Sequence, residues 1–144
     1  MNEKIRRKSF IRIYWYVWFV LVFLLLASRF SIFKSSPENV LFNLFSIYFV
    51  PTWIAVMILN RYEGNRLMSH LKQNHRAKWE HITYVPFFGY GYYNGFRSLP
   101  FLYSKDDLGD QMVTELKKNY RRFIILALTI FFTFPVLFLT LMLT

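Results

Sequence analysis

Three histidines, His70, His75 and His81, lie in one charged segment, and their spacing bears on whether they could bind a metal. Two histidines on a helix must be three or four residues apart to bind the same ion, as in the H-E-x-x-H motif. Here the spacings are five and six residues. In a helical stretch this pattern predicts no metal site, and we interpret the side chains as histidines hydrogen-bonded to neighbouring groups or lipid.

Three aspartates, Asp106, Asp107 and Asp110, form a second cluster of side chains that could do chemistry. A calcium-binding loop needs oxygen ligands that alternate through about twelve residues and end on a glutamate, and no such pattern is present after these aspartates. Carboxylates near the first turn of a helix are explained by capping and by the helix dipole. One catalytic alternative stays open, an interfacial lipid-modifying enzyme that uses Asp107 with His75 or His81 as the base.

Several other functions find no support in the sequence. There is no cysteine, which excludes thiol catalysis, disulfides and cysteine-based metal sites. The glycines at 89, 91 and 95 lack the preceding strand and following helix of a phosphate-binding loop. Between residues 84 and 103 only Arg97 is basic, too little charge to follow a nucleic-acid backbone. We therefore expect no cofactor, no metal and no nucleic-acid partner.

The elements that position these residues are expected to be membrane helices. Of the 144 residues, 55% are hydrophobic and 22% are aromatic, which is too apolar for an ordinary soluble domain. Residues 13–33, 40–60 and 122–143 each supply roughly the 20 apolar residues that cross a bilayer as a helix. A soluble bundle is disfavoured because its helices are seldom apolar on all sides. The sequence predicts an all-α membrane protein with three transmembrane helices.

Basic residues predict the orientation of these helices. The arm 1–12 holds five Lys and Arg and residues 61–122 hold eleven, whereas the outer end of the first span and the turn after it hold only Arg29 and Lys34. The positive-inside rule therefore places the N-terminus and the long loop in the cytoplasm, and the turn 34–39 and the C-terminus outside. No A-x-A cleavage site follows the first apolar run, so this run is expected to be a retained anchor in a bacterial inner membrane.

Basic side chains beside the spans are expected to bind anionic lipid headgroups, which are therefore predicted partners. Each such residue near the surface contributes about 1 kcal/mol. The candidates are Arg6, Arg7, Lys8, Lys117, Lys118, Arg121 and Arg122.

Two amphipathic helices are expected in the cytoplasmic loop, over residues 61–82 and 104–121. Apolar residues recur in both at spacings of three and four, which places them on one helix face. Ser104 and Asp107 have the spacing of a capping box at the start of the second helix. The simplest burial of both apolar faces is an antiparallel helical hairpin that extends the second and third spans, with residues 83–103 as its irregular connection.

This connection contains the run FFGYGYYNGF, residues 87–96, and is unusually rich in rings. Asn94-Gly95 is a typical tight-turn pair, and Pro86 and Pro100 oppose helix formation. Exposed rings are costly in water, so we expect an ordered loop that packs on its own helices, lies in the headgroup layer or accepts a partner. The candidate contact residues are Phe87, Phe88, Tyr90, Tyr92, Tyr93, Phe96 and Trp79.

The layout of residues 40–144 resembles that of small bacterial inner-membrane proteins that include the universal stress protein B family. The likeness is carried by HLKQNHRAKWEHITYVPFF, residues 70–88, and by FLYSKDDLGDQMVTELKKNYRR, residues 101–122. In those proteins a span leads to a short amphipathic segment ending near a Trp or Tyr, as at Trp79, then to an aromatic loop and a charged helix entering the last span. This chain departs from the pattern by its additional N-terminal span. The resemblance implies a multi-pass inner-membrane protein with a stress-related or accessory role, and it supplies no catalytic residues.

The function that the sequence favours is non-catalytic. We expect a small integral membrane protein that acts through protein–protein or lipid-interface contacts, in an accessory, stress-linked or immunity-type role. Its partners would be anionic lipids together with another protein or further copies of the chain. The interfacial enzyme is kept as the alternative.

Overall fold

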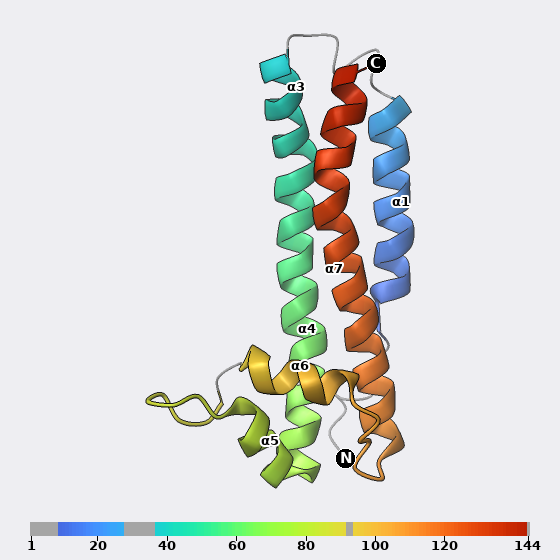
Figure 1. The fold of residues 1–144 in the computed structure, drawn as a ribbon. Helices are drawn as coiled ribbons and strands as arrows, with labels where there is room; N and C mark the ends of the chain where they lie inside the picture. Colours follow the sequence, from blue (N-terminus) through green and yellow to red (C-terminus); the bar gives the residue numbers. More distant parts are fainter. Residues whose placement is uncertain (1–8, 28–36, 92–93, 144) are drawn as a thin grey trace. The chain divides into compact units, whose positions relative to one another are not determined.

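The computed structural model describes residues 9–27, 37–91 and 94–143 (Figure 1). Within these ranges the chain is helical and forms no strand, and a single isolated bridge pairs Val85 with Gly89. The prediction of an all-α fold is therefore confirmed for this part of the chain. The elements are α1 Ile11–Ala27, α3 Pro37–Leu44, the π-helical turn η1 Phe45–Phe49, α4 Val50–Asn74, α5 Arg76–Thr83, α6 Gly95–Tyr103 and α7 Gln111–Leu143.

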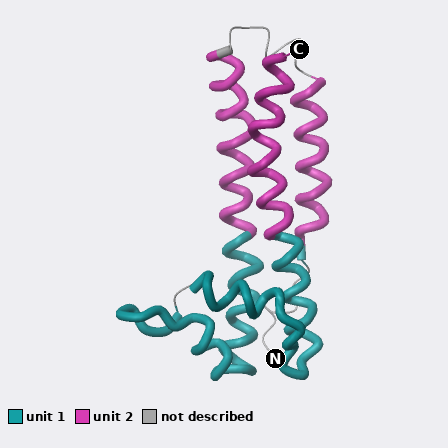
Figure 2. The backbone as a smooth tube through the Cα atoms, viewed as in Figure 1, with its two compact units in different colours: residues 1–9, 60–123 teal, residues 10–59, 124–144 magenta. Residues whose placement is uncertain are grey.

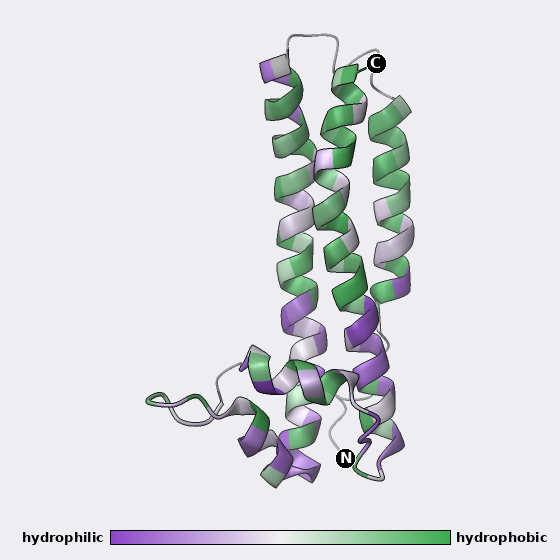
Figure 3. Cartoon of the chain, viewed as in Figure 1, coloured by the Kyte–Doolittle hydropathy of each residue, from purple (hydrophilic) through white to green (hydrophobic). Residues whose placement is uncertain are grey.

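The chain divides into two compact units (Figure 2). Unit 1 comprises residues 1–9 and 60–123, and unit 2 comprises residues 10–59 and 124–144. The helices α4 and α7 contribute residues to both units. Hydrophobic residues dominate the helices of unit 2, whereas those of unit 1 alternate between polar and apolar positions (Figure 3).

Two of the described helices are long and apolar enough to cross a membrane. The elements α3, η1 and α4 run together from Glu38 to Asn74 over 37 residues, and α7 has 33 residues. The expected first span, 13–33, overlaps α1, an apolar helix of 17 residues that is shorter than these two, and residues 28–33 lie outside the described part of the chain. The finding thus covers two of the three predicted spans.

The π-helical turn lies directly before Pro51. Proline has no N–H, so the carbonyl four residues before it loses its α-helical donor, and a wider turn accommodates this loss. The hydroxyl of Thr52 donates to the carbonyl oxygens of Tyr48 at 2.6 Å and Phe49 at 3.1 Å. This side chain shares its one donor between two carbonyls near the point where the helical ladder is interrupted, as Ser and Thr do in membrane helices.

A buried chain of hydrogen bonds links the helices of unit 2. Trp18 Nε1 donates to the Tyr48 hydroxyl at 2.9 Å, and this hydroxyl donates to the carbonyl of Ile130 at 3.2 Å. Tyr48 is completely buried, so its polar atom needs these partners. Many side chains facing outward from unit 2 are apolar as well; among the exposed ones are Phe19, Phe23, Ile54, Ile58, Leu128 and Phe132.

The helices of unit 1 differ from those expected. The helix predicted over 61–82 is interrupted at His75, whose φ of −137° and ψ of 54° are not helical, so α4 ends at Asn74 and α5 comes after the break. The helix predicted over 104–121 begins at Gln111. Asp110 Oδ1 accepts the N–H of Met112 at 2.8 Å, so Asp110 caps α7 and the predicted capping box at Ser104 was wrong.

The connection predicted as irregular over 83–103 contains a helix, α6, in its second half. Asn94 directly precedes this helix, and its Nδ2 donates to the carbonyl of Tyr84 at 2.8 Å. Pro100 lies inside α6 and did not prevent it, because the helix buries Phe101 and Leu102 and is in contact with α5. Burial of this apolar face outweighs the local preference of proline.

Candidate functional site

The aromatic segment, defined as residues 84–96, begins with a narrow loop. The N–H of Val85 donates to the carbonyl of Gly89 at 2.9 Å, and the N–H of Gly89 donates back to the carbonyl of Val85 at 2.9 Å. Phe87 and Gly89 have positive φ angles of 71° and 83°. Glycine adopts this conformation freely, but it strains phenylalanine, so the two hydrogen bonds fix Phe87 at the tip of the loop.

Four of the described rings in the aromatic segment are exposed. The exposed fractions are 103% for Phe87, 96% for Phe96, 70% for Phe88 and 59% for Tyr90. Figure 1 shows the loop extending away from α5 and α6 within unit 1. The candidates Tyr92 and Tyr93 lie outside the described residues. Phe87, Phe88, Tyr90 and Phe96 are therefore apolar side chains that the rest of unit 1 leaves uncovered.

Contacts at the base of the aromatic segment hold it in place. The rings of Tyr84 and Tyr90 lie 5.4 Å apart, and the Arg97 guanidinium lies 5.3 Å from the centre of the Tyr84 ring. Arg97 Nη1 also donates to the carbonyl of His81 at 3.2 Å. Trp79 is half-buried, with Lys72 Nζ 5.0 Å from its ring centre. Trp79 is therefore a supporting contact, whereas the phenylalanines are presented outward.

A pocket of about 390 Å³ lies in unit 1 beside this base, and no pattern in the sequence indicates it. Its walls include Asn60, Arg61, Trp79, Gly91 and Tyr120. The Tyr120 hydroxyl donates to Asn60 Oδ1 at 2.9 Å, which satisfies both groups. The pocket is half polar in character, which fits solvent or a headgroup better than an apolar ligand.

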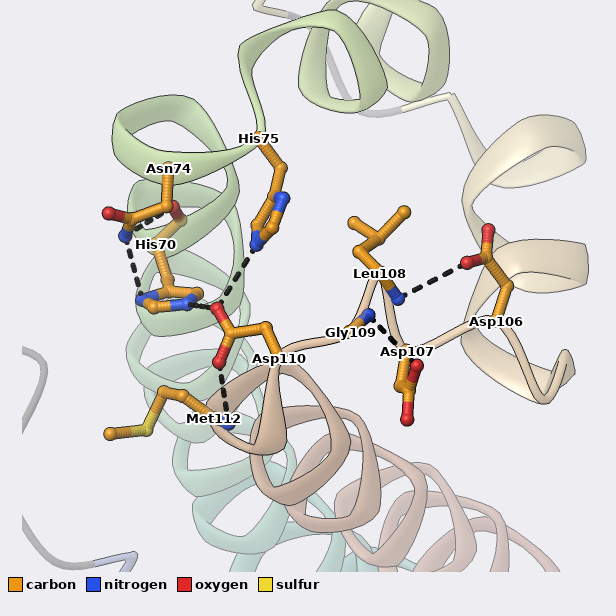
Figure 4. Close-up of polar contacts among 9 residues, drawn as sticks. All are labelled: His70, Asn74, His75, Asp106, Asp107, Leu108, Gly109, Asp110 and Met112. Carbon is orange, nitrogen blue, oxygen red and sulfur yellow. Dashed lines mark hydrogen bonds and ion pairs between the residues drawn. The ribbon is translucent and has the colours of Figure 1, made fainter.

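A cluster of two histidines and one aspartate lies elsewhere in unit 1 (Figure 4). His70 Nε2 lies 2.6 Å and His75 Nε2 lies 3.0 Å from Asp110 Oδ2. His70 comes from α4, His75 from the break after α4, and Asp110 from the cap of α7. The side chain of His70 is 10% exposed, that of His75 22% and that of Asp110 25%.

Electrostatics favour the ionised form of Asp110. Burial raises the pKa of this carboxyl group, but the hydrogen bonds from His70, His75 and the N–H of Met112 outweigh burial and bring the pKa to about 2. Asn74 Nδ2 lies 3.2 Å from both the His70 carbonyl and His70 Nδ1. This arrangement fits a His70 ring that accepts at Nδ1 and donates from Nε2 to the carboxylate.

The cluster also has the composition of a metal-binding site. Three ligand atoms, one from each of His70, His75 and Asp110, lie within 4.8 Å of one another. The spacing argument against a metal assumed one continuous helix through residues 70–81, and the break at His75 removes this assumption. One sequence feature could have indicated this cluster. Asp110 is an aspartate directly before a strongly amphipathic stretch, which is a typical position for a helix N-cap.

The residues of the alternative catalytic pairs, Asp107 with His75 or His81, make other contacts in the structure. Asp107 Oδ1 accepts the N–H of Gly109 at 3.0 Å, and Figure 4 shows its carboxylate turned away from His75. His75 meets Asp110 instead. His81 is exposed, and its backbone carbonyl accepts the hydrogen bond from Arg97. The geometry therefore gives no support to the interfacial enzyme based on Asp107.

Lys117, expected to bind lipid, has a structural role. It is 2% exposed, and its ammonium group donates to the carbonyls of Ser104 at 3.0 Å and Asp106 at 2.8 Å. Burial and the positive charge of Arg121 lower the pKa of Lys117. The ammonium satisfies carbonyls of the turn before α7, which the periodicity could not reveal.

The other candidate lipid-binding residues differ in their accessibility. Lys118 is exposed, whereas Arg121 and Arg122 are half-buried. Arg6, Arg7 and Lys8 lie outside the described residues. Lys118 is thus the candidate of this group that the structure leaves most accessible.

Comparison with protein families, curated proteins and solved structures finds no match to this chain. The resemblance to the universal stress protein B family thus stays an expectation from sequence.

Proposed function

We propose that the protein is a non-catalytic integral membrane protein whose aromatic segment inserts into the interfacial layer of the bilayer that anchors it. The observation that carries this proposal is the exposure of Phe87, at 103%, in the loop held by the Val85–Gly89 hydrogen bonds, and of Phe96, at 96%, in helix α6. Ordered phenylalanine rings in full contact with water are unfavourable, and burial of each contributes roughly 1.5–3 kcal/mol. A surface of this kind needs an occupant.

Charge favours lipid over a protein partner as the occupant. Residues 60–123 hold eleven Lys and Arg but only six Asp and Glu. Anionic headgroups attract such a segment, and aromatic rings beside basic side chains are typical of interfacial contacts. Because the apolar helices keep the chain at a bilayer, the segment meets lipid at a high effective concentration.

The proposed setting is a bacterial inner membrane, with the N-terminus in the cytoplasm and the C-terminus outside. The positive-inside asymmetry supports this orientation. The biological role would be accessory, with the interfacial segment holding the cytoplasmic helices against the membrane. A reporter fused after Thr144 that works only outside the cytoplasm should be active, and an inactive, stably produced fusion would contradict the orientation.

The lipid contact can be tested with a polarity-sensitive fluorophore, because the chain has no native cysteine. The variant Phe87→Cys, labelled with nitrobenzoxadiazole and reconstituted into vesicles with anionic lipid, should emit at shorter wavelength than in lipid-free amphipol. It should also be quenched by lipids brominated near the headgroup. Lys105→Cys is the matched control, since Lys105 is an exposed charged residue of unit 1, and its label should stay water-like.

A water-like, unquenched label at position 87 in vesicles would reject the interfacial contact. If in addition Phe87→Ser and Phe96→Ser abolish binding of a protein that co-purifies with the wild type, while Leu99→Ser retains it, the occupant is a protein. Leu99 is a suitable control because it lies in α6 and is 42% exposed.

A further inference from the structure

The metal-ligating side chains of unit 1 converge from three parts of the chain. His70 is near the end of α4, His75 stands at the break before α5, and Asp110 precedes α7. Their ligand atoms lie within 4.8 Å of one another, although 40 residues separate His70 from Asp110 in sequence. The non-helical backbone of His75 is what turns its ring toward the same carboxylate.

We propose that His70, His75 and Asp110 bind a divalent transition-metal ion, with Zn²⁺ the best fit. Two imidazole nitrogens and one carboxylate oxygen are a borderline ligand set that suits Zn²⁺, whereas Ca²⁺ and Mg²⁺ prefer oxygen ligands throughout. Three protein ligands leave a fourth position for water. The side chains of His75 and Asp110 are 22% and 25% exposed, so water and the ion can reach this position.

The ligand atoms must adjust on the ångström scale to hold the ion. Ligand atoms around a tetrahedral Zn²⁺ with bonds of about 2.0–2.1 Å lie roughly 3.3 Å apart. The His70 and His75 nitrogens lie 2.6 Å and 3.0 Å from Asp110 Oδ2, so each must move away from this oxygen by less than an ångström, and the two nitrogens, which lie within 4.8 Å of each other, must reach the same spacing. In the present arrangement hydrogen bonds occupy these positions, and the ion would displace the protons on Nε2.

Neighbouring groups already orient the ligands. The N–H of Met112 holds Asp110 Oδ1 at 2.8 Å, which leaves Oδ2 facing both histidines. When Nε2 of His70 binds the ion, its proton moves to Nδ1, and a rotation of the Asn74 amide presents an oxygen to it. Such partners fix the tautomer and the ring orientation of metal-bound histidines. Asn74 is thus a positioning residue of the proposed site.

The test uses the full chain purified in a mild detergent and stripped with a chelator. Titration with Zn²⁺ against a chromophoric competitor at neutral pH should show that one ion binds per chain, with a dissociation constant in the micromolar range or lower. His75→Gln and Asp110→Asn should each weaken binding at least about tenfold. His81→Gln is the matched control, because His81 is an exposed histidine of α5 outside the cluster, and its affinity should equal that of the wild type.

Three results would overturn the proposal. The wild type could show no saturable binding, in which case the cluster is a hydrogen-bonded contact only. His75→Gln and Asp110→Asn could bind Zn²⁺ as tightly as the control His81→Gln, in which case the ion binds elsewhere in the protein. Pulsed electron paramagnetic resonance of the Cu²⁺-loaded wild type counts bound imidazoles even if a variant fails to fold, and fewer than two would also reject the site.

Discussion

The two units of the protein satisfy their buried polar groups in different ways. In unit 2 the chain of Trp18, Tyr48 and Ile130 joins neutral groups inside an apolar environment. Unit 1 instead buries charges: Glu63 is 1% exposed and pairs with Arg66 at 2.9 Å, and Lys117 is 2% exposed. This contrast indicates that packing specifies unit 2, whereas unit 1 depends on charges that must keep their partners.

Among the variants that test this contrast, Lys117→Met is expected to have the largest effect on stability. It removes the donors from the carbonyls of Ser104 and Asp106 and should lower the free energy of unfolding of unit 1 by about 2–4 kcal/mol. Hydrogen exchange in detergent should show faster exchange over residues 101–117. Lys118→Met, an exposed neighbour, is the control and should change little. Equal effects of the two variants would show that the buried ammonium is dispensable.

The pH dependence of unit 1 should be the next largest effect. The folded pKa of Asp110, about 2, lies below its ordinary value of 3.8. A depressed pKa stabilises the fold fully above about pH 4, and this contribution is lost as pH falls through 2. Allowing for partial exposure, the loss should be about 1–2 kcal/mol.

Acid unfolding of the wild type and of Asp110→Asn measures this dependence. Hydrogen exchange at the start of α7 is the readout. Asn retains the cap but cannot titrate, so its profile should be flatter between pH 4 and 2. The described buried residues of unit 2 include no carboxylate, so exchange there should not follow the same curve. Parallel acid profiles for wild type and variant would remove Asp110 as the titrating group.

Tyr48→Phe should have a smaller effect, confined to unit 2. It removes the acceptor of Trp18 and the donor to Ile130, and hydrogen bonds within membrane helices contribute about 1 kcal/mol. Unfolding in a denaturing detergent should register this loss, while exchange in unit 1 stays unchanged. Phe49→Leu is a control that alters a ring of the same turn without a polar group. If Tyr48→Phe lowers stability as much as Lys117→Met does, the proposed difference between the two units is wrong.

Phe87→Asn should have the smallest effect on stability, and of the opposite sign. Asparagine tolerates positive φ better than phenylalanine, so unfolding should cost up to about 1 kcal/mol more. The same change removes a fully exposed ring, so vesicle contact should weaken while stability rises. Phe96→Asn, which lies in α6, should weaken contact without the gain. A loss of stability in Phe87→Asn would mean that the ring supports the loop itself.

The sequence predicted the helical class and two of the three expected apolar helices of membrane-spanning length, because hydrophobic periodicity and length determine both. It did not predict the break at His75, since no glycine or proline marks that position. The contact with Asp110, distant in sequence, accompanies the break. Lys117 was assigned to lipid for a similar reason: a lysine in a basic run looks exposed until the turn that covers it is known.

The sequence showed that the aromatic segment is rich in rings, but it did not predict the backbone conformation there. The two prolines suggested irregular backbone throughout, yet the burial of Phe101 and Leu102 stabilises α6 around Pro100. The exposed rings could not be distinguished from buried ones by type, because alternation within a short loop carries no periodic signal. Tertiary packing decided both outcomes.

The π-helical turn at Phe45–Phe49 has a consequence for changes in chain length. One residue fewer in this turn would restore ordinary α-helical geometry, so the helix itself should survive such a deletion. Because the wide turn takes up its extra residue locally, the residues before and after it would keep their relative orientation around the helix axis. Val40 and Leu44, now buried, would stay on the buried side of the helix. A descendant chain that lost this residue could therefore keep its apolar face upstream of residue 45.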